Sequence, residues 1–181
     1  MGNNLNNQLI EEKLRNPQKG VLFALKSFYT IDNKEATIVM PTGTGKTETM
    51  LVYIVSECLD KTIIIVPSSL LREQIFNKCK TMGLIKKFCI LKEKAILPNV
   101  SMIKHIPSSV DVLEEILEKS NIIITTINIV GKFNEEYIEL LNKFCSDVII
   151  DKVHTTGNYT DFVKLVTKLE VGMLKKYLEL L

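Results

Sequence analysis

The sequence contains no tryptophan, only two histidines, and no cysteine pair at metal-binding spacing. Its four cysteines are widely separated, at Cys58, Cys79, Cys89 and Cys145. They are expected to be free, mostly buried thiols rather than a zinc site or a disulfide framework. No stretch approaches the roughly 18 apolar residues of a membrane-spanning helix, and the polar residues 1–8 carry no signal-peptide core. These absences predict a soluble cytoplasmic protein in a reducing compartment, without a membrane partner.

The net charge is also small, at +2. Bulk charge therefore gives no argument for nucleic-acid binding, which would have to rest on local patches. Hydrophobic residues make up 46% of the chain, which excludes a disordered protein. A length of 181 residues fits a single domain. Such a domain buries about 70% of the surface of its unfolded chain, so no metal or disulfide is needed to stabilise it.

Apolar runs alternate with helical patterns along the chain. Five segments are predicted to be strands, at residues 36–39, 62–66, 88–91, 121–125 and 148–151. Helical spacing of apolar residues predicts helices at 9–14, 21–28, from 48 onward, 68–79, 110–119, 135–144 and 162–177. Residues 62–66 are apolar almost throughout, as in a strand that is buried on both faces. This order predicts an α/β fold with a mainly parallel sheet of five or more strands flanked by helices.

A glycine-rich run from Pro41 to Thr47, with the sequence PTGTGKT, joins the first strand to the helix that follows. Strand, glycine loop and helix in this order are the context of a phosphate-binding loop. Gly43 and Gly45 allow the backbone to turn its N–H groups toward an anion. The N-terminus of the next helix adds positive potential at the same place.

Side chains of the same loop suit a magnesium nucleotide. Lys46 would reach the β- and γ-phosphates, and the Thr47 hydroxyl would bind Mg²⁺. Thr42 and Thr44 complete the predicted phosphate cradle. Met40 stands where the strict pattern has glycine, and an ordinary glycine-rich turn is the alternative.

Three other strand ends carry polar residues. Asp151 follows an apolar strand and is placed to bind the Mg²⁺ of a nucleotide; a turn aspartate is the alternative. Hydroxyls and an arginine at the start of a helix suit a nucleic-acid phosphate, although plain helix capping explains them equally; these residues are Pro67, Ser68, Ser69 and Arg72. Thr125 and Thr126 end another strand, and alone they indicate only β-propensity.

Two further features are weaker. Arg15 and Gln18 lie shortly before the first strand, and a glutamine amide can exchange hydrogen bonds with the adenine edge. A surface arginine and glutamine are the alternative. The middle of the chain is basic and could contact nucleic-acid phosphates, although solvated surface side chains are commoner; its residues are Lys86, Lys87, Lys92, Lys94, Lys104 and His105.

Taken together, these residues resemble the first RecA-like motor domain of a superfamily two helicase or translocase. In that family a glutamine motif, a P-loop, a P-[ST] motif, a threonine motif and a D-E-x-H box occur in this order. Here the corresponding residues are Gln18, Pro41 to Thr47, Pro67 to Gln74, Thr125-Thr126 and Asp151 to His154. Within that family, these motifs most resemble those of DEAH-type proteins and of the motor subunits of restriction enzymes. The resemblance implies a nucleic-acid-dependent ATPase with ATP and Mg²⁺ as cofactors, DNA or RNA as partner with DNA favoured, and a coupling role for His154.

Two departures from the family limit what the resemblance implies. Lys152 occupies the position of the glutamate that activates the attacking water, and loss of a general base typically costs about 10²–10⁴ in rate. The chain also ends 27 residues after His154. We expect an N-terminal arm and short helix over 1–13 and one RecA-like lobe over 14–181, with the second lobe supplied elsewhere. The alternatives are a motor lobe that hydrolyses ATP weakly and cannot unwind alone, and a non-catalytic pseudo-ATPase that regulates a partner.

Overall fold

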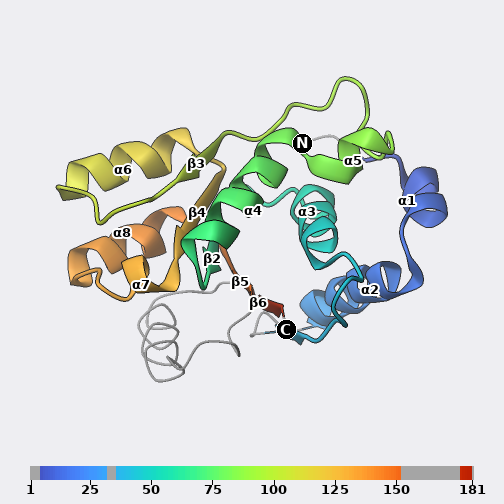
Figure 1. Ribbon diagram of the computed structural model, residues 1–181, viewed down its shortest axis with the longest axis horizontal. Coiled ribbons are helices and arrows are strands. Elements are labelled where there is room, and N and C mark those ends of the chain that lie inside the picture. The colour runs from blue at the N-terminus through green and yellow to red at the C-terminus, as the bar shows by residue number, and fades with distance from the viewer. Residues whose placement is uncertain (1–4, 32–35, 152–175, 181) are drawn as a thin grey trace.

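The computed structural model describes residues 5–31, 36–151 and 176–180. In chain order its elements are α1 (Asn7–Lys13), α2 (Asn16–Ile31), β1 (Ala36–Ile38), α3 (Lys46–Ser56), β2 (Thr62–Val66), α4 (Ser69–Thr81), α5 (Gly83–Lys87), β3 (Val100–Met102), α6 (Val110–Lys119), β4 (Ile122–Thr126), α7 (Ile127–Val130), α8 (Glu135–Phe144), β5 (Asp147–Asp151) and β6 (Lys176–Leu180). Helices cover the sheet on both sides, with α6, α7 and α8 on one and α2, α3 and α5 on the other (Figure 1).

The six strands form one sheet in the order β1-β6-β5-β2-β4-β3, and every pair in it is parallel. The predicted α/β fold with a mainly parallel sheet is therefore confirmed. Because the strands are parallel, all their carboxyl ends lie at one edge of the sheet. The loops after β1, β2, β3 and β4 consequently begin at that edge, where ligands bind in open α/β sheets.

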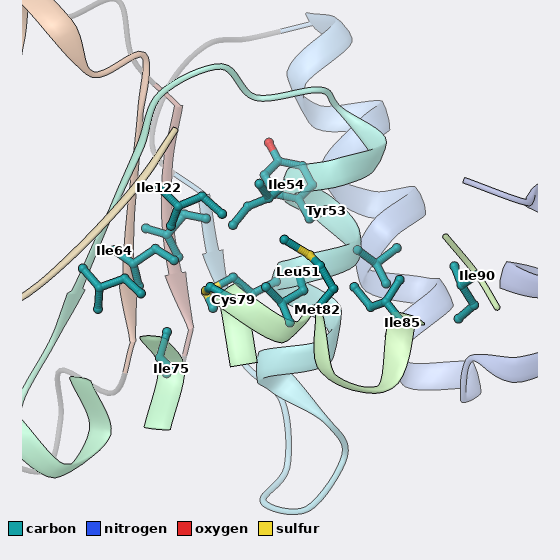
Figure 2. Packing of buried hydrophobic residues seen from close by; sticks show 14 of the residues in the cluster. Leu51, Tyr53, Ile54, Ile64, Ile75, Cys79, Met82, Ile85, Ile90 and Ile122 are labelled. Atoms are coloured by element: carbon teal, nitrogen blue, oxygen red, sulfur yellow. The ribbon is translucent and has the colours of Figure 1, made fainter. Parts of the chain in front are cut away.

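The central strand β2 shows why the sheet is buried on both faces. Ile63 and Ile65 pack into a cluster with α6, α7 and α8, whereas Ile64 and Val66 pack into a second cluster with α3, α4 and α5. Figure 2 shows the second cluster, in which Ile64 lies near residues of α3 and α4. A strand that is apolar at every position has a hydrophobic partner on each side.

Helix starts follow local rules. Ser68, Ser109 and Asn134 cap α4, α6 and α8, and each side-chain oxygen accepts a hydrogen bond from a backbone N–H three residues later. The predicted spans 62–66, 110–119 and 135–144 agree with β2, α6 and α8. Pro17 lies one position inside α2, in the first turn, where its missing N–H has no partner to lose.

The predicted strand at 88–91 is wrong. The chain there folds back after α5, with a left-handed φ of 57° at Cys89, and Ile90 N–H and Leu91 N–H both donate to the carbonyl of Ile85. This tight turn buries Ile90 against the helices, and only an isolated bridge joins Leu91 to Leu5. The third strand in chain order is β3, in a segment with weak sequence pattern.

The predicted helix at 162–177 is wrong at its end, where Tyr177 belongs to β6. Its other apolar positions, Phe162, Leu165, Val166, Leu169 and Met173, lie outside the described residues. Within the described part of the chain, all helices are too short or too polar to cross a membrane. All four cysteines are free, but only Cys79 and Cys145 are buried; Cys58 is half-buried and Cys89 exposed.

Candidate functional site

Three carbonyl groups of the loop from Pro41 to Gly45 accept hydrogen bonds from the protein, those of Pro41, Gly43 and Gly45. The Pro41 carbonyl accepts from Thr44 N and Oγ1, and the Gly43 carbonyl accepts from Arg15 Nη1 at 2.7 Å. The Gly45 carbonyl accepts from Thr49 N, Thr49 Oγ1 and Gln18 Nε2, at 2.9, 3.0 and 3.2 Å. These hydrogen bonds hold the turned backbone of the loop in place.

Both glycines of the loop have left-handed backbone angles, with φ of 82° at Gly43 and 91° at Gly45. A side chain at Gly45 is excluded for a second reason, because a Cβ there would lie 2.4 Å from Gln18 Nε2. Gly45 is also the residue before α3, so its N–H and those of the next three residues have no acceptor inside the helix. Unpaired N–H groups at a helix N-terminus are the donors that a phosphate would need at the place the sequence predicts for it.

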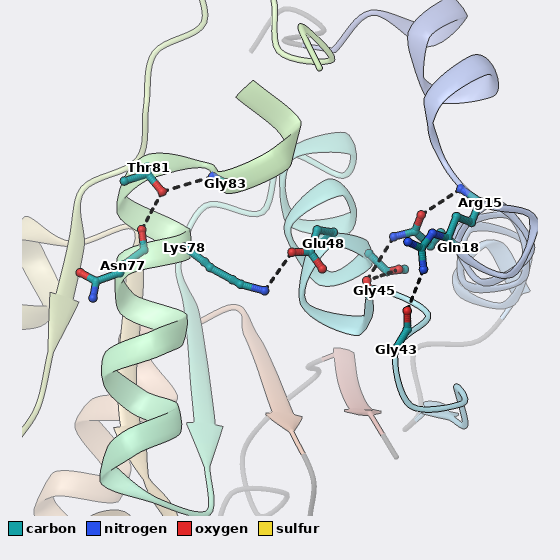
Figure 3. Close-up of polar contacts among 10 residues, drawn as sticks. Arg15, Gln18, Gly43, Gly45, Glu48, Asn77, Lys78, Thr81 and Gly83 are labelled. Atoms are coloured by element: carbon teal, nitrogen blue, oxygen red, sulfur yellow. Dashed lines mark hydrogen bonds and ion pairs between the residues drawn. The ribbon is translucent and has the colours of Figure 1, made fainter. Parts of the chain in front are cut away.

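Gln18 of α2 and Arg15 of the α1–α2 connection form hydrogen bonds with carbonyls of this loop (Figure 3). Gln18 is buried, accepts a hydrogen bond from Arg15 N at 2.9 Å and donates to Gly45. The sequence found both residues but assigned Gln18 to adenine. The Gln18 amide keeps one oxygen lone pair and one N–H that could bind a base, so adenine recognition stays a prediction. Its hydrogen bond to Gly45 was not predicted from the sequence.

Lys46 and Thr47 occupy the first turn of α3 and are half-buried, as are Thr44 and Gly45; Thr42 and Gly43 are exposed. An ammonium and a hydroxyl at a helix N-terminus beside free N–H groups fit the phosphates and metal of a magnesium nucleotide. Glu48 in the same turn forms an ion pair with Lys78 of α4 at 2.9 Å. The ammonium of Lys46, the hydroxyl of Thr47 and the backbone N–H groups therefore suit the negative charge of a magnesium nucleotide.

Asp151 ends β5 and is buried, at the same edge of the sheet as the glycine loop. Strand β6 lies between β1 and β5, so two interstrand spacings, about 10 Å in total, separate the strand of the loop from the strand of Asp151. That separation leaves room for phosphates and a cation between them. Lys152 and His154 lie outside the described residues, and their roles stay predictions.

A cavity of about 290 Å³ opens beside the loop. It is lined by Arg15, Gln18, Gly43 and Gly45 on one side and by Leu84 and Phe88, from α5 and its end, on the other. Leu84 and Phe88 are 40% and 39% exposed, so they offer an apolar wall. Neither residue was predicted from the sequence as part of a site, because α5 was not predicted and Phe88 was assigned to a strand.

The predicted nucleic-acid residues divide by exposure. Ser68 and Ser69 are exposed at the start of α4, and Pro67 is half-buried before them. Arg72, Thr125 and Thr126 are buried. Arg72 Nη1 lies 3.4 Å from the carbonyls of Ile103 and Lys104, and Thr125 Oγ1 donates to Ile103. Arg72 and Thr125 thus have contacts within the protein, and the phosphate contacts predicted for these three side chains stay predictions.

The fold and the loop define a class, the RecA-like motor domain of superfamily two helicases. The family described as type III restriction enzyme, res subunit (ResIII), matches residues 11–177, and the chain belongs to this family.

Three solved structures share the fold. They are the Hef helicase domain of Pyrococcus furiosus (TM-score 0.59, 16% identity, 97% of this chain and 34% of that one), the DUF1998 helicase MrfA (0.60, 13%, 99% and 29%) and a hypothetical ATP-dependent RNA helicase from Sulfolobus tokodaii (0.59, 16%, 96% and 48%). The chain therefore spans less than half of the length of each. No curated protein matches the sequence significantly.

Proposed function

We propose that this chain is the ATP·Mg²⁺-binding first motor lobe of a nucleic-acid-dependent ATPase. The observation that carries the proposal is the loop from Pro41 to Gly45, whose carbonyls are bound by the protein at the sheet edge that also holds Asp151. Residues 14–181 are proposed to form the lobe, with residues 1–13 as an arm and short helix. DNA is the preferred nucleic acid, since the family takes its name from restriction enzymes.

In this proposal the chain's residues divide the work of binding. Lys46 holds the β- and γ-phosphates, with backbone N–H groups of the loop around them. Thr47 and Asp151 hold the cation, which neutralises phosphate charge when it is bound. Thr42 and Thr44 flank the phosphates. Gln18 and Arg15 keep the loop in its binding conformation and stand beside the cavity proposed for the base.

Hydrolysis is proposed to be weak, because Lys152 replaces the residue that would activate water. A protonated lysine cannot accept the proton of the attacking water. Strand separation is proposed to need a second RecA-like lobe, on the same polypeptide or a partner, which moves against this one. The alternative is a pseudo-ATPase that regulates a partner or a nucleic-acid complex, and Lys152 is the feature that favours it.

Binding is tested by calorimetric titration of the chain with ATP and MgCl₂. We expect saturable binding that Lys46→Ala abolishes. Lys132→Ala is the matched control, because Lys132 is an exposed lysine between α7 and α8 and should leave the affinity unchanged. Absence of ATP binding by the unaltered, folded chain would refute both the motor-lobe and the nucleotide-regulated versions of the proposal.

Turnover is tested with Lys152→Glu, measured as phosphate release with and without single-stranded DNA. We expect the substitution to raise turnover by about 10²-fold or more, the range for restoring a general base. Turnover by the unaltered chain at the rate of Lys152→Glu would remove the pseudo-ATPase alternative. Equal turnover of the two proteins, at the low level of the unaltered chain, would contradict the assignment of weak hydrolysis to Lys152.

A further inference from the structure

A carboxylate lies beside the glycine loop, next to the place proposed for the phosphates of ATP. Glu48 belongs to the first turn of α3, and its Oε2 would be 3.5 Å from a Cβ on Gly45. The Glu48 side chain is 15% exposed, so water and salt screen its charge only in part. Among the described residues that line the adjoining cavity, Glu48 is the one acidic side chain. An unpaired carboxylate at this position would repel a nucleotide.

The opposite charge comes from another helix. Lys78 belongs to the last turn of α4, and its Nζ donates to Glu48 Oε1 at 2.9 Å (Figure 3). Oε1 of the carboxylate is thus bound by the ammonium, while Oε2 lies toward Gly45. The pair neutralises the charge of Glu48 beside the loop, and it joins the helix that follows β2 to the helix that follows the loop.

Lys46 does not neutralise Glu48. The two residues lie two positions apart in α3, and helical side chains at this spacing point to different faces. In the part of the chain that the structure describes, Lys78 is the cation that forms an ion pair with Glu48. Lys46 therefore remains available for the β- and γ-phosphates because Lys78 takes the carboxylate.

A second ion pair of the same kind shows what is particular to the first. Lys143 of α8 and Glu114 of α6 also join two helices, with Nζ 3.0 Å from Oε1. Ion pairs between partly exposed side chains contribute little to stability, so neither pair is needed to hold the fold. The pair of Lys78 and Glu48 differs by its place beside the glycine loop.

We propose that Lys78 is a positioning residue for ATP, which neutralises Glu48 and so lets the glycine loop accept the charged phosphates. The proposal rests on the proposed function, because it concerns the same ATP site and adds α4 to the elements that set its affinity. Lys78 acts through Glu48 and does not touch the nucleotide. Its removal should therefore weaken ATP binding only while the carboxylate of Glu48 is present.

The first test is Lys78→Met, measured by calorimetric titration with ATP and MgCl₂. Methionine keeps the apolar part of the side chain and removes its charge. We expect about tenfold weaker binding, the effect of one uncompensated charge roughly 10 Å from another in an effective dielectric of about 20. Lys143→Met is the matched control and should leave the ATP affinity unchanged. Urea denaturation without nucleotide should give both variants nearly the stability of the unaltered chain.

The second test adds Glu48→Gln, alone and together with Lys78→Met. Glu48→Gln should bind ATP at least as tightly as the unaltered chain, because it removes a negative charge beside the phosphates. The double variant should recover the affinity of Glu48→Gln, since no carboxylate remains to be neutralised. A double variant as weak as Lys78→Met would mean that Lys78 acts on the nucleotide directly or only holds α4, and would refute the positioning role.

The outcomes separate this proposal from the proposed function. ATP binding by the unaltered chain, with Lys78→Met as tight as Lys143→Met, would overturn the role of Lys78 and leave the motor lobe standing. No ATP binding by the unaltered, folded chain would overturn both. Circular dichroism establishes that the variants are folded, and Lys78→Gln replaces Lys78→Met if that variant unfolds.

Discussion

At the scale of single residues, the identity of Gly45 is set by a side chain that lies 27 positions earlier. A Cβ on residue 45 would lie only 2.4 Å from Gln18 Nε2, which is too close for two atoms that are not bonded. The same amide donates to the Gly45 carbonyl. Glycine is therefore favoured at position 45 for two reasons, the lack of space for a Cβ and the left-handed φ of 91°. The loop conformation depends on glycine at one position and glutamine at another.

Gly45→Ala should weaken ATP binding and lower stability. A left-handed angle costs a residue with a Cβ about 1–2 kcal/mol, and the methyl group must also displace Gln18. We expect at least about tenfold weaker binding, which corresponds to 1.4 kcal/mol, measured by calorimetry. Gly20→Ala is the control, because Gly20 lies within α2 with open space around it. There alanine should raise the free energy of unfolding by about 0.5–1 kcal/mol. Equal ATP affinity in the two variants would contradict the steric account.

Residue-level prediction from sequence succeeded where local spacing determines the outcome. Ser68 caps α4 as its position before an apolar pattern predicts, and the glycines take the left-handed angles that the loop requires. It did not find contacts whose partner is distant in sequence. Arg72 was assigned to a phosphate because it follows a helix start, and that contact stays a prediction. Its hydrogen bonds to carbonyls of the loop between β3 and α6 follow from no local pattern.

At the scale of elements, β6 joins the glycine-loop strand to the rest of the sheet. Among the described strands, β1 pairs only with β6, and β6 in turn pairs with β5. The helix predicted at 162–177 overlaps the start of this strand, the segment 176–180, because Tyr177 continues a helical spacing from residue 162. Its strand state is fixed by pairing on both sides, which five residues of sequence do not encode.

Leu178→Pro should separate β1 from the sheet. The backbone of Leu178 pairs with Ala36 on one side and Ile149 on the other. Proline removes a ladder N–H from a central strand, where it is rarely tolerated. We expect a loss of at least about 3 kcal/mol in the free energy of unfolding, at the upper end of single substitutions, together with loss of ATP binding. Leu178→Val, which keeps the N–H, is the control. Urea denaturation measures both variants, and near-identical midpoints would contradict the central position of β6.

At the scale of the whole molecule, the sequence predicts the layers better than the arrangement of strands within them. Strands apolar at every position, such as Thr62–Val66, must be covered on both faces, so helices on both sides of a parallel sheet follow directly. The strand order does not follow, because β1 pairs with β6, and the paired residues Ala36 and Leu178 are 142 positions apart in the sequence (178 − 36). The cavity beside the glycine loop was missed for the same reason.

The two-layer core buries groups that titrate at alkaline pH. Cys79 is 0% exposed between α4 and the sheet, and burial raises the pKa of its thiol to about 12. Burial also raises the pKa of Tyr53, whose hydroxyl has no hydrogen-bond partner among the described residues. Both groups favour the protonated form in the folded protein, so the stability of the whole domain is linked to pH.

The chain should lose stability as the pH rises above about 8.5, the ordinary pKa of a cysteine thiol. Below that pH Cys79 is protonated in both states and contributes no pH dependence. Above it the unfolded chain releases the proton and the folded chain keeps it until about pH 12. Unfolding is therefore favoured by up to about 1.4 kcal/mol per pH unit from this thiol. Urea titrations between pH 8 and pH 9.5 measure this loss below the pH range in which an unfolded tyrosine ionises.

Cys79→Ala should be less stable at neutral pH because it leaves a cavity, and its free energy of unfolding should fall less steeply with pH. Parallel slopes in the two proteins would show that the buried thiol is not the group that links stability to pH.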